Sequence, residues 1–136
     1  MKTFALSYFS AAVLMLGLDA IWLTLTAAPL YRARLGALML PKPDFAPAVV
    51  FYALYVLGMV VLVILPALTA RSWEFALTRG ALLGCVAYAT YDLTNQATLR
   101  GWSPVISCAD IAWGTTLTAI AATGAYFVVK AVLIRS

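Results

Sequence analysis

Long apolar runs alternate with short polar stretches along the chain, and this pattern predicts four membrane-spanning helices. The runs cover about residues 4–27, 48–68, 80–99 and 105–129. Each run has roughly the 20 residues that an α-helix needs to cross a hydrocarbon core. Short connections favour antiparallel neighbours. We therefore expect an all-α fold, in which residues 1–136 form one domain: a transmembrane four-helix bundle with up-down-up-down connections.

The first run resembles a secretory signal peptide, because Lys2 precedes it and Thr26-Ala27-Ala28 could serve as a cleavage site. It is longer than the roughly 7–15 apolar residues of a signal peptide, and Asp19 interrupts it, so we expect it to remain as a span. The loop that follows, residues 29–47, contains a basic stretch at 30–39 that could form a short helix in the membrane interface. Prolines then delay the second span.

The remaining connections are predicted to be short polar turns. Residues 69–79 are expected to form the turn between the second and third spans. Before the fourth span, Ser103 is a suitable N-cap and Pro104 suits the first helical position.

Small residues at four-residue intervals predict close packing between helices. They are Gly80 and Gly84 in the third span, and Gly114, Thr118 and Ala122 in the fourth. We expect this packing to occur within one chain rather than between two copies.

Composition identifies the bilayer as the solvent of this protein. The sequence is 65% hydrophobic and only 10% charged, with a mean hydropathy of +0.98. A water-soluble fold of this size could not bury so much apolar surface. The net charge of +4 is spread over segment ends, which suits membrane lipids as partners and gives no support to nucleic-acid binding.

Two residue types narrow the chemistry further. The chain has no histidine, which excludes nucleophilic Ser–His catalysis and haem binding through histidine. The two cysteines, Cys85 and Cys108, fall at depths about 15 Å apart, too far for a disulfide, and we interpret them as packing residues.

Three of the five acidic residues lie inside apolar runs, and they are the strongest candidates for a functional site. They are Asp19, Asp92 and Asp110. Up-down-up-down connections place all three about 9–13 Å below the same membrane face. A charge at mid-membrane costs at least about 2.5–3.5 kcal/mol. Crowded carboxylates disfavour each other's ionised forms, so we expect one to hold a proton, an arrangement suited to acid–base catalysis. We predict these acids as catalytic, with Asp92 at the centre.

Aromatic and amide side chains surround the predicted acidic layer. Tyr88, Tyr91, Asp92 and Asn95 share one helix face. A tryptophan follows Asp19 and another follows Asp110 at three residues' distance, on the same face. Two tyrosines of the second span reach a similar depth. The predicted substrate-binding residues are therefore Asn95, Tyr88, Tyr91, Trp22, Trp113, Tyr52 and Tyr55. Three cations on this side could extend into the layer: Arg32, Arg34 and Arg100.

Three sequence blocks together resemble a known family. They are Leu18-Asp19-Ala20-Ile21-Trp22-Leu23, Tyr88-Ala89-Thr90-Tyr91-Asp92-Leu93-Thr94-Asn95 and Asp110-Ile111-Ala112-Trp113-Gly114. The family is a small bacterial one of multi-pass integral-membrane proteins, classed as a domain of unknown function. The resemblance covers nearly the whole chain and implies a protein of the bacterial inner (cytoplasmic) membrane. Members are similar in lying, in some genomes, near genes for methyltransferases that modify membrane acyl chains, which implies lipid chemistry.

Basic residues predict which side of the membrane holds the N-terminus. One side would hold Lys2, Arg71, Arg79, Lys130 and Arg135, and the other Arg32, Arg34, Lys42 and Arg100. Cytoplasmic loops carry the excess of basic residues, so five against four favours a cytoplasmic N-terminus.

Three functions remain open at this point, and so does whether the chain is an enzyme. The first is acid–base chemistry on a lipid or isoprenoid-like substrate that enters laterally, oriented by Asn95 and the tyrosines. The second is proton-coupled binding or transport of a small molecule, which would favour a homodimer because four helices are few for a carrier. The third is a structural accessory protein of a membrane complex. No metal or cofactor is predicted, although carboxylates and an amide would suit magnesium or manganese.

Overall fold

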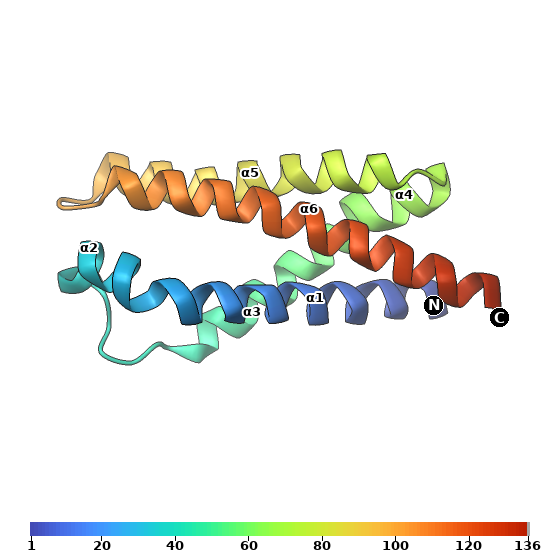
Figure 1. Cartoon of the computed structure of the whole chain (residues 1–136), viewed down its shortest axis with the longest axis horizontal. Coiled ribbons are helices and arrows are strands. Elements are labelled where there is room, and N and C mark those ends of the chain that lie inside the picture. Colours follow the sequence, from blue (N-terminus) through green and yellow to red (C-terminus); the bar gives the residue numbers. More distant parts are fainter. Residues whose placement is uncertain (136) are drawn as a thin grey trace.

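Nearly the whole described chain is helical, and four long helical stretches run up-down-up-down along one axis (Figure 1). The computed structural model describes residues 1–135; the side chain of Arg135 and Ser136, the last residue of the predicted domain, lie outside it. No β-strand occurs within residues 1–135. The two termini lie at the same end of the bundle. The predicted all-α bundle is therefore confirmed.

The first stretch is longer than predicted. It consists of α1 (Lys2–Thr26), the π-helix η1 (Ala27–Arg32), α2 (Ala33–Leu35) and the 3₁₀-helix η2 (Gly36–Leu38). The α-helix α1 ends close to the predicted residue 27, but the expected start of a loop at residue 29 is wrong, because the chain stays helical through Pro29. A π-helical turn tolerates the missing N–H of a proline better than a regular turn does. The predicted basic helix is present, but it joins α1 directly.

The second stretch begins earlier than predicted. It consists of α3 (Phe45–Met59), the π-helix η3 (Val60–Ile64) and α4 (Leu65–Ala70). The side chain of Asp44 caps α3 by accepting a hydrogen bond from the N–H of Ala46 at 3.0 Å. Pro47 is tolerated because it lies in the first turn, where its N–H would have no helical partner.

The third stretch, α5 (Trp73–Thr98), corrects the predicted turn at residues 69–79. That turn contains only Arg71 and Ser72. The Ser72 hydroxyl accepts a hydrogen bond from the N–H of Phe75 at 3.1 Å and so begins the helix. The polar residues that suggested a longer turn lie on exposed positions of the first turns of α5. The fourth stretch, α6 (Pro104–Arg135), begins at the predicted proline.

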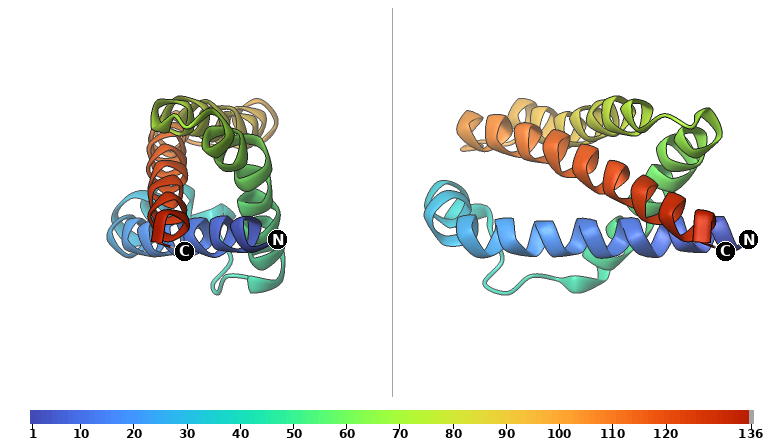
Figure 2. Two further views of the ribbon diagram at one scale, coloured as in Figure 1. Left: turned by 90° about the vertical axis from the view of Figure 1, so that its right-hand side faces the viewer. Right: turned by 45° about the vertical axis from the view of Figure 1, so that its right-hand side comes forward.

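Small residues bring α5 and α6 together within the chain, as predicted. A Cβ added to Gly80 would lie 3.0 Å from the carbonyl oxygen of Thr118, and one added to Gly84 would lie 2.7 Å from its Oγ1. Figure 2 shows α6 beside α5 at their shared turn and then crossing obliquely to α1 at the end that holds the termini. The core lies between α1, the second stretch and α6, with Met15, Met59 and Leu117 fully buried.

The outer surface is apolar, as a bilayer requires. In the described residues, three stretches are long and apolar enough to span a membrane: Lys2–Leu38, Phe45–Ala70 and Pro104–Ile134. α5, which holds the predicted span 80–99, is not among them, because polar side chains such as Asp92, Asn95 and Gln96 lower its hydropathy. α5 packs against α6 along the bundle.

Candidate functional site

Three buried carboxyl groups gather toward the end of the bundle that holds α2 and the α5–α6 turn. Asp19 of α1 is 7% exposed, Asp92 of α5 is 0% exposed and Asp110 of α6 is 8% exposed. Asp110 lies within electrostatic range of both other acids. The up-down-up-down connections therefore bring together the three acids that the sequence singled out.

Asp19 is held by donors from two other helices. The hydroxyl of Tyr52, on α3, donates a hydrogen bond to Oδ2 of Asp19. The indole Nε1–H of Trp113, on α6, donates to Oδ1 at 3.0 Å. Both oxygens of this buried carboxyl group therefore have a hydrogen-bond donor, as buried polar atoms require. Three helices are thus tied together at one carboxylate.

Asp110 is the acceptor at the end of an aromatic chain of hydrogen bonds. It accepts from the hydroxyl of Tyr31, which in turn accepts from the Nε1–H of Trp22 at 3.0 Å. The ring of Trp22 stacks on that of Trp113, with centroids 4.5 Å apart and planes 6° apart. The stack links the surroundings of Asp110 to those of Asp19 and fixes both indoles in orientation.

Tyr31 is a site residue that the sequence analysis missed. It belongs to η1, in the region that the sequence analysis assigned to the first loop. A tyrosine in such a loop is usually interpreted as a membrane-interface residue. The helical conformation continues through this region, so Tyr31 can reach across to α6. The one sequence signal was Pro29 within an otherwise helix-forming stretch. Here the proline lies in a π-helical segment, and π-helical turns are frequent at functional sites.

Asp92 differs from the other two acids because no donor reaches it. Neither carboxylate oxygen accepts a hydrogen bond from a donor within the described residues, although both are buried. The polar group placed against it is the carboxyl of Asp110, with which it interacts directly. Two carboxyl groups can form a hydrogen bond only when one of them holds a proton. A hydrogen bond between the carboxyl groups of Asp92 and Asp110 would therefore need a proton on one of them.

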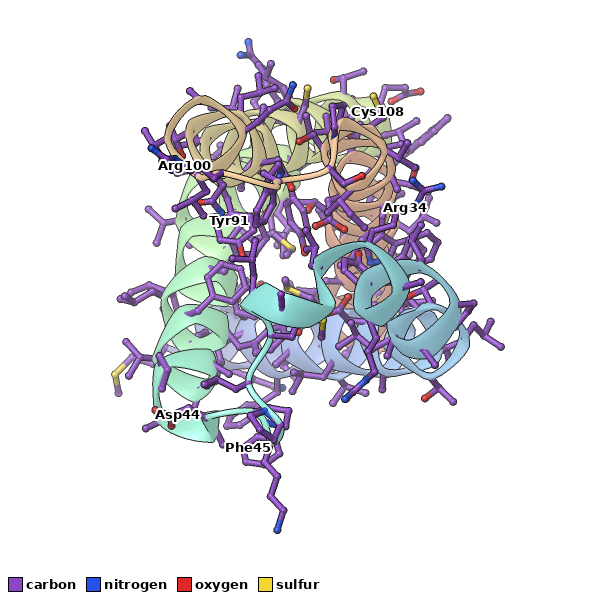
Figure 3. All side chains as sticks on the ribbon, turned by 90° about the vertical axis from the view of Figure 1, so that its left-hand side faces the viewer. Arg34, Asp44, Phe45, Tyr91, Arg100 and Cys108 are labelled. Carbon is purple, nitrogen blue, oxygen red and sulfur yellow. The ribbon has the colours of Figure 1, made fainter. Side chains whose placement is uncertain are left out.

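A cavity of about 290 Å³ lies beside this pair. Its lining comes from α3, α5 and α6: Phe51, Ala87, Tyr88, Tyr91 and Asp110. Phe51 is 44% exposed and Tyr91 is 58% exposed, so both stand at its mouth. In Figure 3, which looks onto this end of the bundle, Tyr91 lies on the inner side of α5, facing α2 and α3. The cavity is thus aromatic, with one carboxyl group in its wall.

Two of the predicted residues pair with groups other than the acids. The hydroxyl of Tyr55 pairs with Oγ1 of Thr118 at 2.8 Å, and its ring packs edge-on against Tyr88 at 6.4 Å. Asn95 is half-buried and interacts with the hydroxyl of Tyr91 rather than with a carboxyl group. The three cations that were expected to extend into the layer are all exposed: Arg32, Arg34 and Arg100.

The acids do not converge on one point as metal ligands would. Within residues 1–135, no group of three or more histidine, cysteine, aspartate or glutamate side chains could hold a metal ion. Aromatic donors separate Asp19 from the Asp92–Asp110 pair. Cys85 and Cys108 are free thiols.

Comparison with known proteins identifies one family. The sequence model of a family described as "Predicted membrane protein (DUF2177)" matches residues 4–127, which is most of the chain. No curated protein and no solved structure gives a significant match. The match includes all three acids and the aromatic residues that surround them.

Proposed function

The chain belongs to the DUF2177 family of predicted membrane proteins, and from that premise we propose that its buried acids form a proton-transfer site for a lipid or isoprenoid-like substrate. The observation that carries the proposal is the carboxyl pair of Asp92 and Asp110 beside an aromatic cavity. A buried carboxyl without a donor is costly for stability, so its presence favours a role in chemistry over a role in packing.

Asp110 is the acid that would contact the substrate, because it lines the cavity. In the pair, one carboxyl group holds a proton and the other can accept one. Such a pair can deliver a proton to one substrate atom and remove a proton from another. Asp92 supplies or stores the proton behind Asp110, and the Tyr31 hydroxyl holds Asp110 in place. This chemistry is a proton-neutral isomerisation and needs no redox partner.

An amphiphilic substrate suits the cavity. Phe51 and Tyr91 are exposed at its mouth, between α3 and α5, where a molecule dissolved in the bilayer can enter from the side. The aromatic walls would pack against an apolar chain. Aromatic faces also attract positive charge, such as develops when an acid protonates a carbon–carbon double bond. Apolar packing and cation stabilisation together favour an unsaturated chain as the reacting group.

Quantitative lipid mass spectrometry on a deletion strain tests the proposal. The strain is complemented with the wild type, with Asp92→Asn, with Asp110→Asn, or with Asp44→Asn as the control. Asp44→Asn is the same type of substitution at an exposed position away from the buried acids. Asp44 caps α3, and asparagine caps helices equally well, so the control should fold normally. We expect the wild type and Asp44→Asn to restore a lipid species that the other two variants do not. Identical lipids in all strains, with equal amounts of inserted protein, would refute the proposed enzymatic function.

Proton-coupled binding or transport is the second candidate, and the same carboxyl pair favours it. A cationic ligand in the cavity would lie beside Asp110 and could displace the shared proton. The enzyme changes the ligand, whereas the carrier releases a proton and leaves the ligand intact. Proton release from the purified protein on ligand addition, absent in Asp110→Asn, would support the carrier. A carrier of four helices would be expected to act as a homodimer.

We also propose that the chain lies in the bacterial inner membrane with both termini in the cytoplasm. The support is the count of basic residues, five on the side of the termini against four on the other side. The acidic site would then open near the outer face of the membrane.

A further inference from the structure

A second cavity, of about 480 Å³, lies at the opposite end of the bundle, and we propose that it binds the phosphate group of an anionic membrane phospholipid. It is lined by Leu68, Arg71, Tyr126, Lys130, Leu133 and Ile134. These residues come from α4, from the turn before α5 and from the last part of α6, near the termini in Figure 1. The proposal does not depend on the chemistry of the acidic site, from which this cavity is separated along the bundle.

Two cations from different elements converge on this cavity without an acid in its lining. Arg71 comes from the turn after α4, and Lys130 comes from α6. Among the described residues, Glu74 is the acidic residue at this end of the bundle, and it does not line the cavity. Its side chain is exposed and accepts a hydrogen bond from the Ser72 hydroxyl at 2.8 Å. Two like charges facing one space repel each other, and a bound anion removes that repulsion.

The backbone of Arg71 and the side chain of Lys130 are both held in place within the chain. Arg71 has a φ angle of 54°, a left-handed conformation that costs energy for a residue with a side chain. Its N–H donates to the carbonyl of Leu68 at 3.2 Å, which fixes the turn. The Lys130 ammonium lies over the ring of Tyr126, 5.7 Å from its centroid, and that ring is only 1% exposed. The Lys130 ammonium is therefore anchored to a buried ring, and the backbone that carries the Arg71 side chain is fixed.

The apolar part of the lining distinguishes a lipid from a soluble anion. Ile134 is 75% exposed and Leu133 is 39% exposed, and both continue the lipid-facing surface of α6. A phospholipid would place its phosphate between Arg71 and Lys130 and its acyl chains along these side chains. Basic pockets of this kind at the ends of membrane helices bind anionic head groups. Free phosphate would gain nothing from the apolar wall.

Native mass spectrometry of the full chain tests this inference. The protein is released from nanodiscs that contain equal amounts of phosphatidylglycerol and phosphatidylcholine, and the bound lipids are counted. We expect the wild type to retain phosphatidylglycerol preferentially. Arg71→Gly and Lys130→Gln should each reduce the preference about fivefold, the effect of removing one basic group near an anionic surface. Glycine suits the left-handed position, so Arg71→Gly removes the charge without adding strain.

Arg79→Gln is the matched control. Arg79 is a cation at the same end of the bundle, but it lies over the ring of Phe75, 5.4 Å from its centroid, and does not line the cavity. It should keep the wild-type preference, as should Arg71→Lys, which retains the charge. An equal loss in Arg79→Gln, or no preference in the wild type, would overturn the proposal. Competition by millimolar inorganic phosphate would overturn it in favour of a free-phosphate site.

Discussion

The ring of Tyr88 lies directly against the bare Cα of Gly114, so that a Cβ on this glycine would overlap the ring atoms. Tyr88 lines the cavity beside the acids, and Gly114 follows Asp110 by one helical turn. The absence of one side chain on α6 therefore sets the position of a cavity wall on α5. Close helix packing and the shape of the site have the same cause.

Gly114→Ala should consequently destabilise the protein and disturb the cavity. The added methyl group forces Tyr88 to move or the helices to separate, and overpacking of this kind costs about 1–3 kcal/mol. Chemical unfolding in detergent measures the change. Gly58→Ala is the control, since Gly58 lies in α3 with nothing within 4 Å of an added Cβ. That variant should be neutral or slightly more stable. Equal stability of Gly114→Ala and the wild type would contradict the packing described here.

Removing the Tyr52 hydroxyl should destabilise the bundle more than removing a tyrosine hydroxyl that bonds to a backbone carbonyl at an exposed position. Tyr52→Phe deletes one donor to the buried carboxyl group of Asp19, and a buried acceptor left without a donor costs about 1–3 kcal/mol. Tyr8→Phe is the comparison, because the Tyr8 hydroxyl donates at 3.1 Å to the backbone carbonyl of Ala53, a neutral acceptor at an exposed position. Unfolding in detergent compares the two. A larger loss for Tyr8→Phe would contradict the role of the Tyr52 hydroxyl as a donor that a buried carboxyl group needs.

Much of this architecture was predictable from the sequence, because apolar length and connectivity determine which ends of the helices meet. Asp19, Asp92 and Asp110 were placed at one depth on that basis alone. The rotation of each helix about its axis was not predictable. This rotation decides that Asp92 faces Asp110 while Asp19 faces Trp113. It also turns Tyr55 toward Thr118 and away from the acids.

Residues near the ends of the helices were harder to predict. Pro29 suggested the end of a helix, but a π-helical segment accommodates it and carries Tyr31 to Asp110. Glu74 and Arg79 suggested a loop, but they lie on exposed positions of α5. In both cases the folded structure accommodates residues that usually end a helix. Contacts with the rest of the fold make this possible, and they cannot be read from the local sequence.

Asp92→Asn should leave the protein as stable as the wild type or make it more stable. Asp92 receives no donor in the described structure, and an asparagine amide could donate to Asp110 without the cost of burying a charge. Asp19→Asn should instead lose about 1–3 kcal/mol, because the Trp113 and Tyr52 donors bind the two carboxyl oxygens and an asparagine amide has only one. Unfolding in detergent measures both. If Asp92→Asn is the more destabilised variant, Asp92 holds the helices together and its proposed role in proton transfer fails.

The turn between α5 and α6 should face the outside of the inner membrane. The termini and the α4–α5 turn share the opposite end of the bundle (Figure 1), and the five basic residues predicted on that side favour the cytoplasm. Single cysteines at Arg100 and at Ala70, both exposed, are introduced into a chain whose native cysteines are replaced by alanine. A membrane-impermeant maleimide should label Arg100→Cys in spheroplasts and Ala70→Cys only after lysis. The reverse labelling would invert the orientation and place the acidic site near the cytoplasmic face. The labelling pattern therefore also decides from which side of the membrane the protons of the Asp92–Asp110 pair come.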